Sequence, residues 1–356
     1  MKKITQKHAK VDFSGQHCWV GVDVHKISYS VALLSEAGVR TEFSMPADPQ
    51  RLLGKLAAMG VIIKGLAYES GPTGYALAWA CQRAGIEFVV AAPSRIPRPL
   101  AATGKTDRLD SMRLAELLAK DMLKSIAVPT EAENHLRSLE RRRQHIVERK
   151  RTVRQHIKSL LLFHGLDEPA GLGHWSSGSI EALREMPLSG PLRVTLDSYL
   201  REHAFLLEEL YCLRKQLATA LQADEKAQTA GYLRSIPGVG ETTATTFLTE
   251  VFRPERFTRA EEICAYVGLA PVTSHSGSGK VTSRLRHVGQ NYLRSILVEG
   301  AWRLISAEER YRALFARIRS RTGLAQKALV AVARKLLILL WRVAVEKRPY
   351  HPATQG

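Results

Sequence analysis

The sequence predicts a chain of three parts: a layered α/β domain, a pair of long amphipathic helices, and a mainly helical C-terminal domain. Short apolar runs alternate with helical patterns over residues 1–128, which is typical of a sheet covered by helices. Apolar residues then recur every three or four positions along much of residues 129–225, as they do in coiled coils. Residues 226–350 keep the helical spacing apart from one polar interruption rich in glycine and serine.

The first domain is expected to begin with a β-meander and to continue as alternating strands and helices. Its first three strands are predicted at residues 18–23, 28–34 and 41–45 and are separated by short turns. Further strands are expected at 61–69 and 86–92, and helices at 49–59, 75–84 and 108–120.

Two long helices, at residues 131–164 and 192–223, flank a loop-rich segment. They form either an antiparallel hairpin within one chain or a coiled coil between chains, and the sequence does not choose between the two. The helices after residue 294 combine apolar, core-facing positions with a cationic outer face.

The charge of the chain indicates a polyanionic partner. It contains 52 Lys and Arg against 34 Asp and Glu, a net charge of +18. Residues 131–160 hold 9 cations against 4 acidic residues, residues 280–350 hold 16 against 4, and residues 161–279 are net acidic. Basicity concentrated in this way is the pattern of a surface that follows phosphates. The backbone-binding side chains are expected to be Arg141, Arg142, Arg143, Lys280, Arg284 and Arg286.

A membrane partner is excluded, because every apolar face beside this charge is needed for a core and no apolar run is long enough to span a bilayer. We expect a cytoplasmic, nucleoid-associated protein.

Four carboxylates in the first domain are candidate metal ligands. Asp23 interrupts an apolar strand, Glu69 ends a later strand, and Asp107 and Asp110 are three residues apart at a helix start. If they converge on one sheet edge, their oxygens suit Mg²⁺ or Mn²⁺, and two such ions can clamp the oxygens of a phosphodiester displacement. Alternatively, Asp107 and Asp110 stabilise a helix start and Glu69 caps a turn; Asp23 still needs a cationic partner.

A glycine turn and a serine-rich segment mark the C-terminal domain. Pro-Gly-Val-Gly at 237–240 resembles a helix-hairpin-helix, in which the amides around Gly238 and Gly240 hold a DNA phosphate. The alternative is an ordinary tight turn between packed helices. Residues 272–280 have the composition of an exposed loop, and a serine there can attack phosphorus if its proton is removed.

Six short motifs occur along the chain in an order that resembles the DEDD transposases of insertion-sequence family one-ten. They are GVDVHK at 21–26, YESG at 68–71, KTDRLD at 105–110, IPGVG at 236–240, GLAP at 268–271 and SG at 276–277. The chain looks like the bridge-RNA-guided recombinases of that family, and the resemblance covers nearly its whole length.

The resemblance implies a RuvC-like, RNase H-type first domain in which Asp23, Glu69, Asp107 and Asp110 bind the metal. It also implies assembly into a dimer or tetramer through the coiled coil, and a C-terminal transposase domain whose nucleophile is Ser276. Since His275 stands where the family often has another serine, Ser274 and Ser278 are the alternative nucleophiles.

The implied reaction is attack of Ser276 on a DNA phosphate, with a covalent phosphoserine intermediate. A guide RNA would pair with donor and target DNA, as in other RNA-guided systems. Two alternatives remain at this point: a RuvC-type endonuclease that cuts branched DNA by water attack, and a DNA- or RNA-binding protein with no enzymatic activity.

Overall fold

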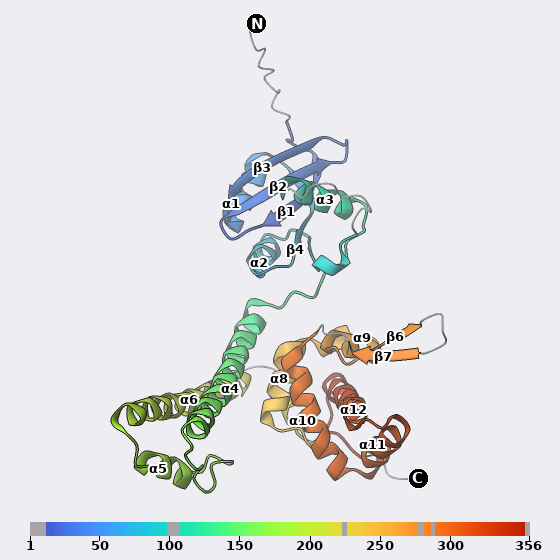
Figure 1. The fold of residues 1–356 in the computed structure, drawn as a ribbon. Coiled ribbons are helices and arrows are strands. Elements are labelled where there is room, and N and C mark those ends of the chain that lie inside the picture. Colours follow the sequence, from blue (N-terminus) through green and yellow to red (C-terminus); the bar gives the residue numbers. More distant parts are fainter. Residues whose placement is uncertain (1–11, 98–106, 223–225, 276–280, 286–288, 353–356) are drawn as a thin grey trace. The chain divides into compact units, whose positions relative to one another are not determined.

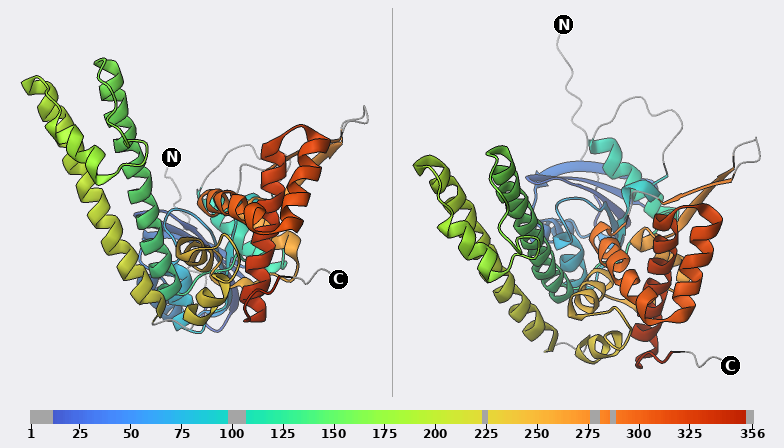
Figure 2. Two further views of the ribbon diagram at one scale, coloured as in Figure 1. Left: turned by 90° about the horizontal axis from the view of Figure 1, so that it is seen from below. Right: turned by 60° about the horizontal axis from the view of Figure 1, so that its bottom comes forward.

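The structure, a computed structural model, describes residues 12–97, 107–222, 226–275, 281–285 and 289–352, and within these ranges the side chains of 107–109, 272–275 and 281–285 are not described. The chain folds into two compact units, Met1–Glu131 and Ala132–Gly356. Their elements are labelled in Figure 1, and Figure 2 gives two further views.

The first unit is built on a five-stranded mixed sheet with the order β3-β2-β1-β4-β5 (Figure 1). The strands are β1 (His17–Val24), β2 (Ser28–Ser35), β3 (Arg40–Pro46), β4 (Ile62–Glu69) and β5 (Phe88–Ala91). The first three strands form an antiparallel meander, whereas β4 pairs parallel to β1 and β5 pairs parallel to β4.

Helices cover both faces of this sheet. On one face, α1 (Pro49–Ala58) and α2 (Ala76–Arg83) bury Leu52 and Leu77 against alternate residues of the central strands. On the other face, α3 (Asp107–Ala119) buries Leu114 against Ala67 and Ala91. The side-chain period of two along each strand produces these two apolar faces. A short turn of 3₁₀ helix, η1 (Pro93–Arg95), follows β5.

The second unit begins with a helical hairpin. Helices α4 (Glu131–Phe163) and α6 (Gly190–Gln222) pack along a shared apolar stripe that includes Val153 and Leu200. The connection between them contains α5 (Ser177–Glu185), whose Leu183 is fully buried in the same cluster. The structure therefore decides the open question in favour of an antiparallel hairpin within the chain.

The rest of the second unit is a mainly helical body with one small hairpin. Its elements are α7 (Lys226–Leu233), α8 (Glu241–Val251), η2 (Pro254–Arg256), α9 (Ala260–Val267), β6 (Pro271–His275), β7 (Val281–Leu285), α10 (Asn291–Ala307), α11 (Glu309–Thr322) and α12 (Ala325–Glu346). Its core is a single apolar cluster formed by α7 to α12, with Phe247, Leu304 and Leu336 at less than 2% exposure.

The predicted fold class is confirmed: the first domain has the RNase H-like mixed sheet with helices, and long helices and a mainly helical region follow. Two local expectations were wrong. Helix α5 lies in the segment expected to be loop, and residues 271–275 and 281–285 form a two-stranded antiparallel sheet where a loop was expected. In the part of the chain that the structure describes, no helix has the length and apolar character needed to span a membrane.

Candidate active site

The register of the central strands brings Asp23 and Glu69 to one edge of the sheet. β1 and β4 are parallel, and their last aligned pair is Val22 with Tyr68. Asp23 and Glu69 each follow that pair by one residue, so both lie at the carboxyl ends of adjoining strands. Residues aligned across parallel strands point to the same face, which places the two carboxylates on a common face.

That common face is the one covered by α3. Gly21 and Ala67 precede Asp23 and Glu69 by two residues and therefore share their face. Ala67 packs against Leu114 of α3. A Cβ added to Gly21 would lie 2.0 Å from the carbonyl oxygen of Ser111, so glycine is what lets α3 lie directly on β1.

Helix α3 runs antiparallel to β1, and its first turn lies at the carboxylate edge. A Cβ on Gly65, which aligns with Trp19, would meet Leu118, whereas Gly21 meets Ser111. The residues of β1 closer to Asp23 therefore face residues of α3 closer to its N-terminus. Asp107 begins the helix and Asp110 follows one turn later, so the helix brings both positions to the edge that holds Asp23 and Glu69.

The carboxylates at this edge differ in exposure. The Asp23 side chain is 20% exposed, Asp110 is half-buried and Glu69 is exposed. The side chain of Asp107 lies outside the described residues, and only its place in α3 is known. The edge therefore contains carboxylates that water and a substrate can reach.

His25 is a neighbour of the site that sequence reasoning did not single out. Its Nε2 lies 3.1 Å from Oδ2 of Asp23, and its backbone N–H donates to the carbonyl of Ser28 in the turn after β1. The signal was its place two residues after Asp23 in the motif GVDVHK, but a sequence does not show that the turn folds the imidazole back onto the carboxylate.

The donor set at the edge fits a hard divalent cation. Carboxylate oxygens are the protein ligands that Mg²⁺ and Mn²⁺ favour. Among the side chains that the structure describes, no three His, Cys, Asp or Glu residues are already gathered closely enough to hold an ion. Strand register puts Asp23 and Glu69 at the edge. The direction of α3 brings the positions of Asp107 and Asp110 toward the same edge.

The predicted nucleophile lies outside the described residues. Ser276, together with Ser278, Lys280 and Arg286, falls in the gaps at 276–280 and 286–288. The backbone on either side is the hairpin of β6 and β7, which pairs His275 with Val281. Ser274 and Arg284 are part of these strands, but their side chains are not described.

The glycine turn joins two helices, as predicted, and its two glycines have different surroundings. Gly238 has a φ of +87° and packs on α10, where an added Cβ would lie 2.7 Å from the carbonyl oxygen of Gly300. Gly240 is exposed at the N-terminus of α8, and an added Cβ would meet nothing within 4 Å. Gly238 therefore serves helix packing, and only the Gly240 end of the turn is open to a ligand.

The arginines of α4 are largely engaged inside the second unit. Arg143 is 3% exposed, and its guanidinium binds both carboxylate oxygens of Glu140, at 2.8 and 2.6 Å, and the hydroxyl of Tyr292. Burial alone would lower the pKa of Arg143, but the pair with Glu140 raises it. The predicted phosphate contact by Arg143 is therefore wrong, because its guanidinium is buried with a carboxylate.

Arg141 is also paired, although its side chain stays half-exposed. It donates to both oxygens of Glu250 in α8, which Arg137 binds as well. Burial favours the neutral Glu250 carboxyl, but the two arginines outweigh burial and lower its pKa. Arg142 is exposed and has no ion pair among the described residues, so it is the member of the trio open to a phosphate.

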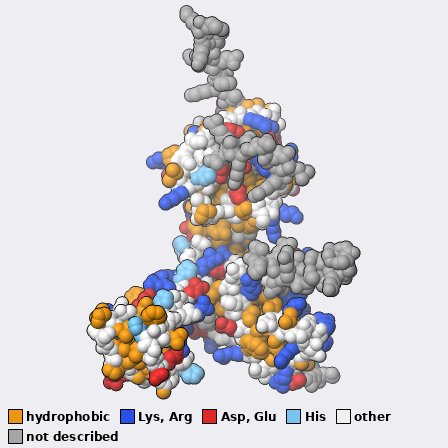
Figure 3. Space-filling view, viewed as in Figure 1, with side chains coloured by type: hydrophobic (Ala, Val, Ile, Leu, Met, Phe, Trp, Pro, Cys, Tyr) orange, Lys and Arg blue, Asp and Glu red, His pale blue; other side chains and the backbone are white. Residues whose placement is uncertain are grey.

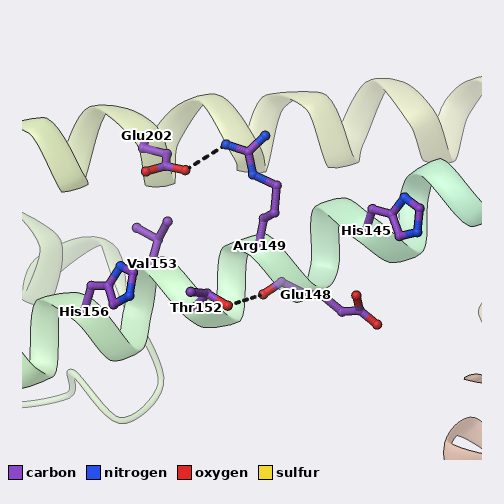
Figure 4. Close-up of a pocket in the computed structure, with 7 residues that line it drawn as sticks. All are labelled: His145, Glu148, Arg149, Thr152, Val153, His156 and Glu202. Carbon is purple, nitrogen blue, oxygen red and sulfur yellow. Dashed lines mark hydrogen bonds and ion pairs between the residues drawn. The ribbon is translucent and has the colours of Figure 1, made fainter.

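A surface hollow lies between α4 and α6 (Figure 4). It is lined by His145, Glu148, Arg149, Thr152, Val153, His156 and Glu202. Arg149 crosses the hollow from α4 to pair with Glu202 of α6 at 3.0 Å, and Thr152 donates to the backbone carbonyl of Glu148. The Arg149–Glu202 pair joins the two helices of the hairpin, whereas the Thr152 contact lies within α4, and neither involves a predicted site residue.

Two family models match the chain. Residues 20–165 match a transposase model of the DEDD class, and residues 230–316 match the model described as "Transposase IS116/IS110/IS902 family". The first match contains the carboxylate edge, and the second contains the glycine turn and the β6–β7 hairpin. Families of the DEDD class are typically metal-dependent, in agreement with the donor set at this edge.

Several similar proteins are also described as transposases, and they align with this chain over most of their length. The putative transposase y4qE of Sinorhizobium fredii is 30% identical, with 97% of this chain and 92% of that protein aligned. The transposase for insertion sequence element IS1111A of Coxiella burnetii is 24% identical over 75% of this chain and 73% of its own. The transposase for IS1328 of Yersinia enterocolitica is 24% identical over 79% and 82%.

These matches exclude the interpretation of the chain as a binding protein without enzymatic activity, and they favour transposition over the RuvC-type resolution of branched DNA. With its carboxylate edge on an RNase H-like sheet and its transposase C-terminal region, the chain belongs to the IS110 family of transposases, enzymes that transfer phosphoryl groups of DNA.

Proposed function

We propose that the chain is an RNA-guided recombinase that moves an insertion sequence by cutting and joining DNA through a phosphoserine intermediate. The observation that carries the proposal is the convergence of Asp23, Glu69 and the first turn of α3 at one sheet edge, in a chain of the IS110 family. The guide RNA, the phosphoserine intermediate and the roles of individual residues are proposed here for this chain, beyond the transposase activity of its family.

The carboxylate edge is proposed to hold Mg²⁺ or Mn²⁺ through Asp23, Glu69, Asp107 and Asp110. When bound, the metal would neutralise charge that develops on the phosphate and on the entering and leaving oxygens. His25, within hydrogen-bond distance of Asp23, is proposed to orient that carboxylate in the way that outer-shell partners orient metal ligands.

Ser276 is proposed as the nucleophile. Its Oγ forms a bond to phosphorus while the bond from phosphorus to one sugar oxygen breaks. A base takes up the serine proton, and a proton passes to the departing sugar oxygen, which leaves as a hydroxyl. In the second half of the reaction, the hydroxyl of another strand attacks the phosphoserine and releases Ser276. Each step exchanges one phosphoester for another, so joining needs no external energy source.

The nucleic-acid surface is proposed to include Arg142, Lys280, Arg284, Arg286 and the open amides beside Gly240. Arg142 and Gly240 are exposed. Arg143 is left out because it is buried, and Gly238 because it packs on α10. The guide RNA would supply sequence recognition by pairing with donor and target DNA, and the protein would bind the shape and backbone of the paired strands.

We also propose that the chain acts through three parts, residues 1–128, 129–225 and 226–350, and that the helical hairpin of the middle part joins copies into a dimer or tetramer. Val194 and Phe205 support this. They are 66% and 55% exposed, and their spacing of eleven residues puts them on one face of α6, opposite its buried stripe. Exposed apolar side chains of this size on a helix face are typical of interaction sites.

A strand-exchange assay with donor and target DNA and the guide RNA tests the proposal. Ser276→Ala is expected to abolish both cleavage and exchange, whereas Ser274→Ala and Ser278→Ala leave them near the wild-type level. Asp23→Asn is expected to abolish activity as well, since it removes a charged metal ligand. Exchange by Ser276→Ala at the wild-type rate would contradict the serine mechanism.

The metal part of the proposal has its own readout. Isothermal titration calorimetry is expected to show Mn²⁺ binding to the wild-type protein. Asp23→Asn should bind Mn²⁺ more weakly, and Ser276→Ala should bind it as the wild type does. Equal Mn²⁺ binding by Asp23→Asn and the wild type would contradict the assignment of the ligands.

A further inference from the structure

Apart from its first residue, Glu309, helix α11 belongs to a stretch of sequence that contains no acidic residue. Between Arg310 and Val345 the chain has no Asp or Glu, and α11 alone contributes Arg310, Arg312, Arg317, Arg319 and Arg321. A positive potential over the C-terminal half of this helix is therefore not cancelled by acidic residues nearby in the sequence.

Two of these arginines are engaged at the start of the helix. Arg310 pairs with Glu308 at 2.8 Å and lies against Tyr350, and Arg312 pairs with Glu309 at 2.6 Å. Arg317, Arg319 and Arg321 are exposed, and none of them has an ion pair among the described residues. Three guanidiniums on the C-terminal half of α11 are therefore available to an external anion.

The outer face of α11 has a regular pattern. Tyr311, Phe315 and Ile318 face the α10 and α12 side, where Tyr311 is buried and the other two are half-buried. At 100° per residue, the opposite side is a strip of small residues between two rows of arginines. The strip consists of Ala313, Ala316 and Ser320; one row is Arg310, Arg317 and Arg321, and the other is Arg312 and Arg319.

This outer face is open and slightly hollowed. A shallow depression beside the strip is lined by Phe315, Ala316, Arg319, Ser320 and Gly323. In the space-filling view, Lys and Arg side chains gather at the right of the lower body, where Figure 1 labels α11 (Figure 3). The depression results from the small side chains of the strip, which let another surface approach the helix backbone.

We propose that α11 is a docking helix for duplex DNA, with its strip of small residues facing the major groove and its two rows of arginines on the phosphates of the two strands. A helix with its side chains is about 10–12 Å across, and the major groove of B-form DNA is about 12 Å wide. The major groove of A-form RNA is too narrow to admit side chains in this way. DNA is also the substrate class of the family.

The proposal adds to the nucleic-acid surface named above and rests only on the action of the protein on DNA. It needs neither Ser276 nor the guide RNA. Its failure would therefore leave the phosphoserine mechanism standing, and the failure of that mechanism would leave α11 as a DNA-binding helix.

The first test compares binding of a short fluorescent DNA duplex by the full-length wild type and by the variant R317Q/R319Q/R321Q. The affinity is expected to fall roughly tenfold or more at about 0.1 M salt. The slope of log affinity against log salt should become shallower by about 2–3, because each phosphate contact contributes about 0.9 to it. The control R184Q/R201Q/R259Q removes the same charge from exposed positions on other elements and should keep the wild-type slope.

Arg319 and Arg321 lie in the last turn of α11, where a cation also stabilises the helix dipole. The melting temperature of each variant is therefore measured alongside binding. A lower melting temperature with an unchanged salt slope would show a structural role and overturn the proposal. Loss of binding to an A-form RNA duplex while DNA binding is kept would overturn it too.

A second variant tests the approach of the helix backbone without changing charge. Ala316→Trp fills the strip and is expected to weaken duplex binding several-fold with little change in slope. Ala182→Trp, at an exposed position of α5, is the matched control and should bind as the wild type does. Equal binding by Ala316→Trp and the control would contradict insertion of this face into a groove.

Discussion

At the level of single residues, the carboxylate edge depends on a residue with no side chain. Gly21 is the point at which α3 lies on β1, because an added Cβ would lie 2.0 Å from the carbonyl oxygen of Ser111 and 2.6 Å from the amide nitrogen of Ala115. Both atoms belong to the helix backbone, so the helix as a whole must move to accept a methyl group. The placement of the first turn of α3 at the carboxylate edge follows from this contact.

Gly21→Ala is therefore expected to lower the free energy of unfolding of the first unit by about 2–3 kcal/mol, the upper part of the range for overpacked sites. It should also reduce metal-dependent cleavage, since α3 carries two of the proposed ligands. Urea unfolding and a cleavage assay measure the two effects. Gly54→Ala in α1, where an added Cβ meets nothing within 4 Å, should be neutral or stabilising. Wild-type stability and activity in Gly21→Ala would contradict the close packing of α3 on β1.

The sequence singled out these carboxylates as candidate ligands but did not show their surroundings. Asp23 could be predicted as a site residue because a carboxylate within an apolar strand is costly without a partner. The contact of His25 with Asp23 depends on how one turn folds, which no residue pattern shows. Arg143 was misassigned for a similar reason: Tyr292, which it binds together with Glu140, is 149 residues away in the chain.

At the level of elements, the helical hairpin contains a buried imidazole that is held neutral. His203 of α6 is 1% exposed, and the Arg154 Nε–H of α4 donates to its Nε2 at 3.0 Å. Burial lowers the pKa of His203 to about 4, with a further contribution from the charges of Arg154 and Lys150. Protonation would place a third cation there and remove the acceptor for Arg154.

The depressed pKa of His203 predicts that the hairpin loses stability in mild acid. The unfolded chain takes up a proton near pH 6.5 and the folded chain only near pH 4, so stability is fully present above pH 6.5 and declines between the two values. The loss for this group is about 2–3 kcal/mol at pH 4. His203→Gln keeps an acceptor for Arg154 and should show a smaller decline in unfolding free energy between pH 7 and pH 4.5.

His174→Gln, at an exposed histidine of the same unit, is the control and should follow the wild-type pH dependence. The same decline in His203→Gln as in the wild type would show that His203 does not bind its proton differently in the folded and unfolded chain.

The elements that the sequence did not predict have different physical causes. Glycines at 171, 173 and 178 suggested a loop, but the apolar positions Ile180 and Leu183 still build the one amphipathic face that α5 needs to pack. The strands at 271–275 and 281–285 are short and polar, and their pairing with each other, rather than burial of an apolar face, defines them. Long, strongly periodic elements were predictable because core packing dictates their pattern.

At the level of the whole molecule, the net charge of +18 is distributed over surfaces with different roles. On α4, part of the basic surplus is internal: Arg137, Arg141 and Arg143 pair with Glu250 and Glu140. On α11, three arginines remain exposed and are proposed to bind DNA. Composition predicted the polyanionic partner correctly, but only the folded chain separates the cations that stabilise it from those that face outward.

The exposed apolar face of α6 makes a prediction about assembly. Phe205→Glu is expected to reduce the molar mass in light scattering to that of one chain, because it places a charge on the proposed contact between copies. Glu185→Gln, at an exposed position of α5, is the control and should keep the assembled mass. A wild-type protein that stays monomeric with and without nucleic acid would contradict assembly through the hairpin.

The central claim is that DNA strands are cut and joined through a covalent bond to Ser276, and the most direct measurement is the mass of the trapped protein–DNA adduct. Denaturing electrophoresis after incubation with labelled donor DNA should show label on the wild-type protein, and mass spectrometry of the digested adduct should place the phosphate on Ser276. Ser274→Ala should form the adduct, and Ser276→Ala should not. Cleaved and exchanged DNA without any adduct, or an adduct on another residue, would contradict the account.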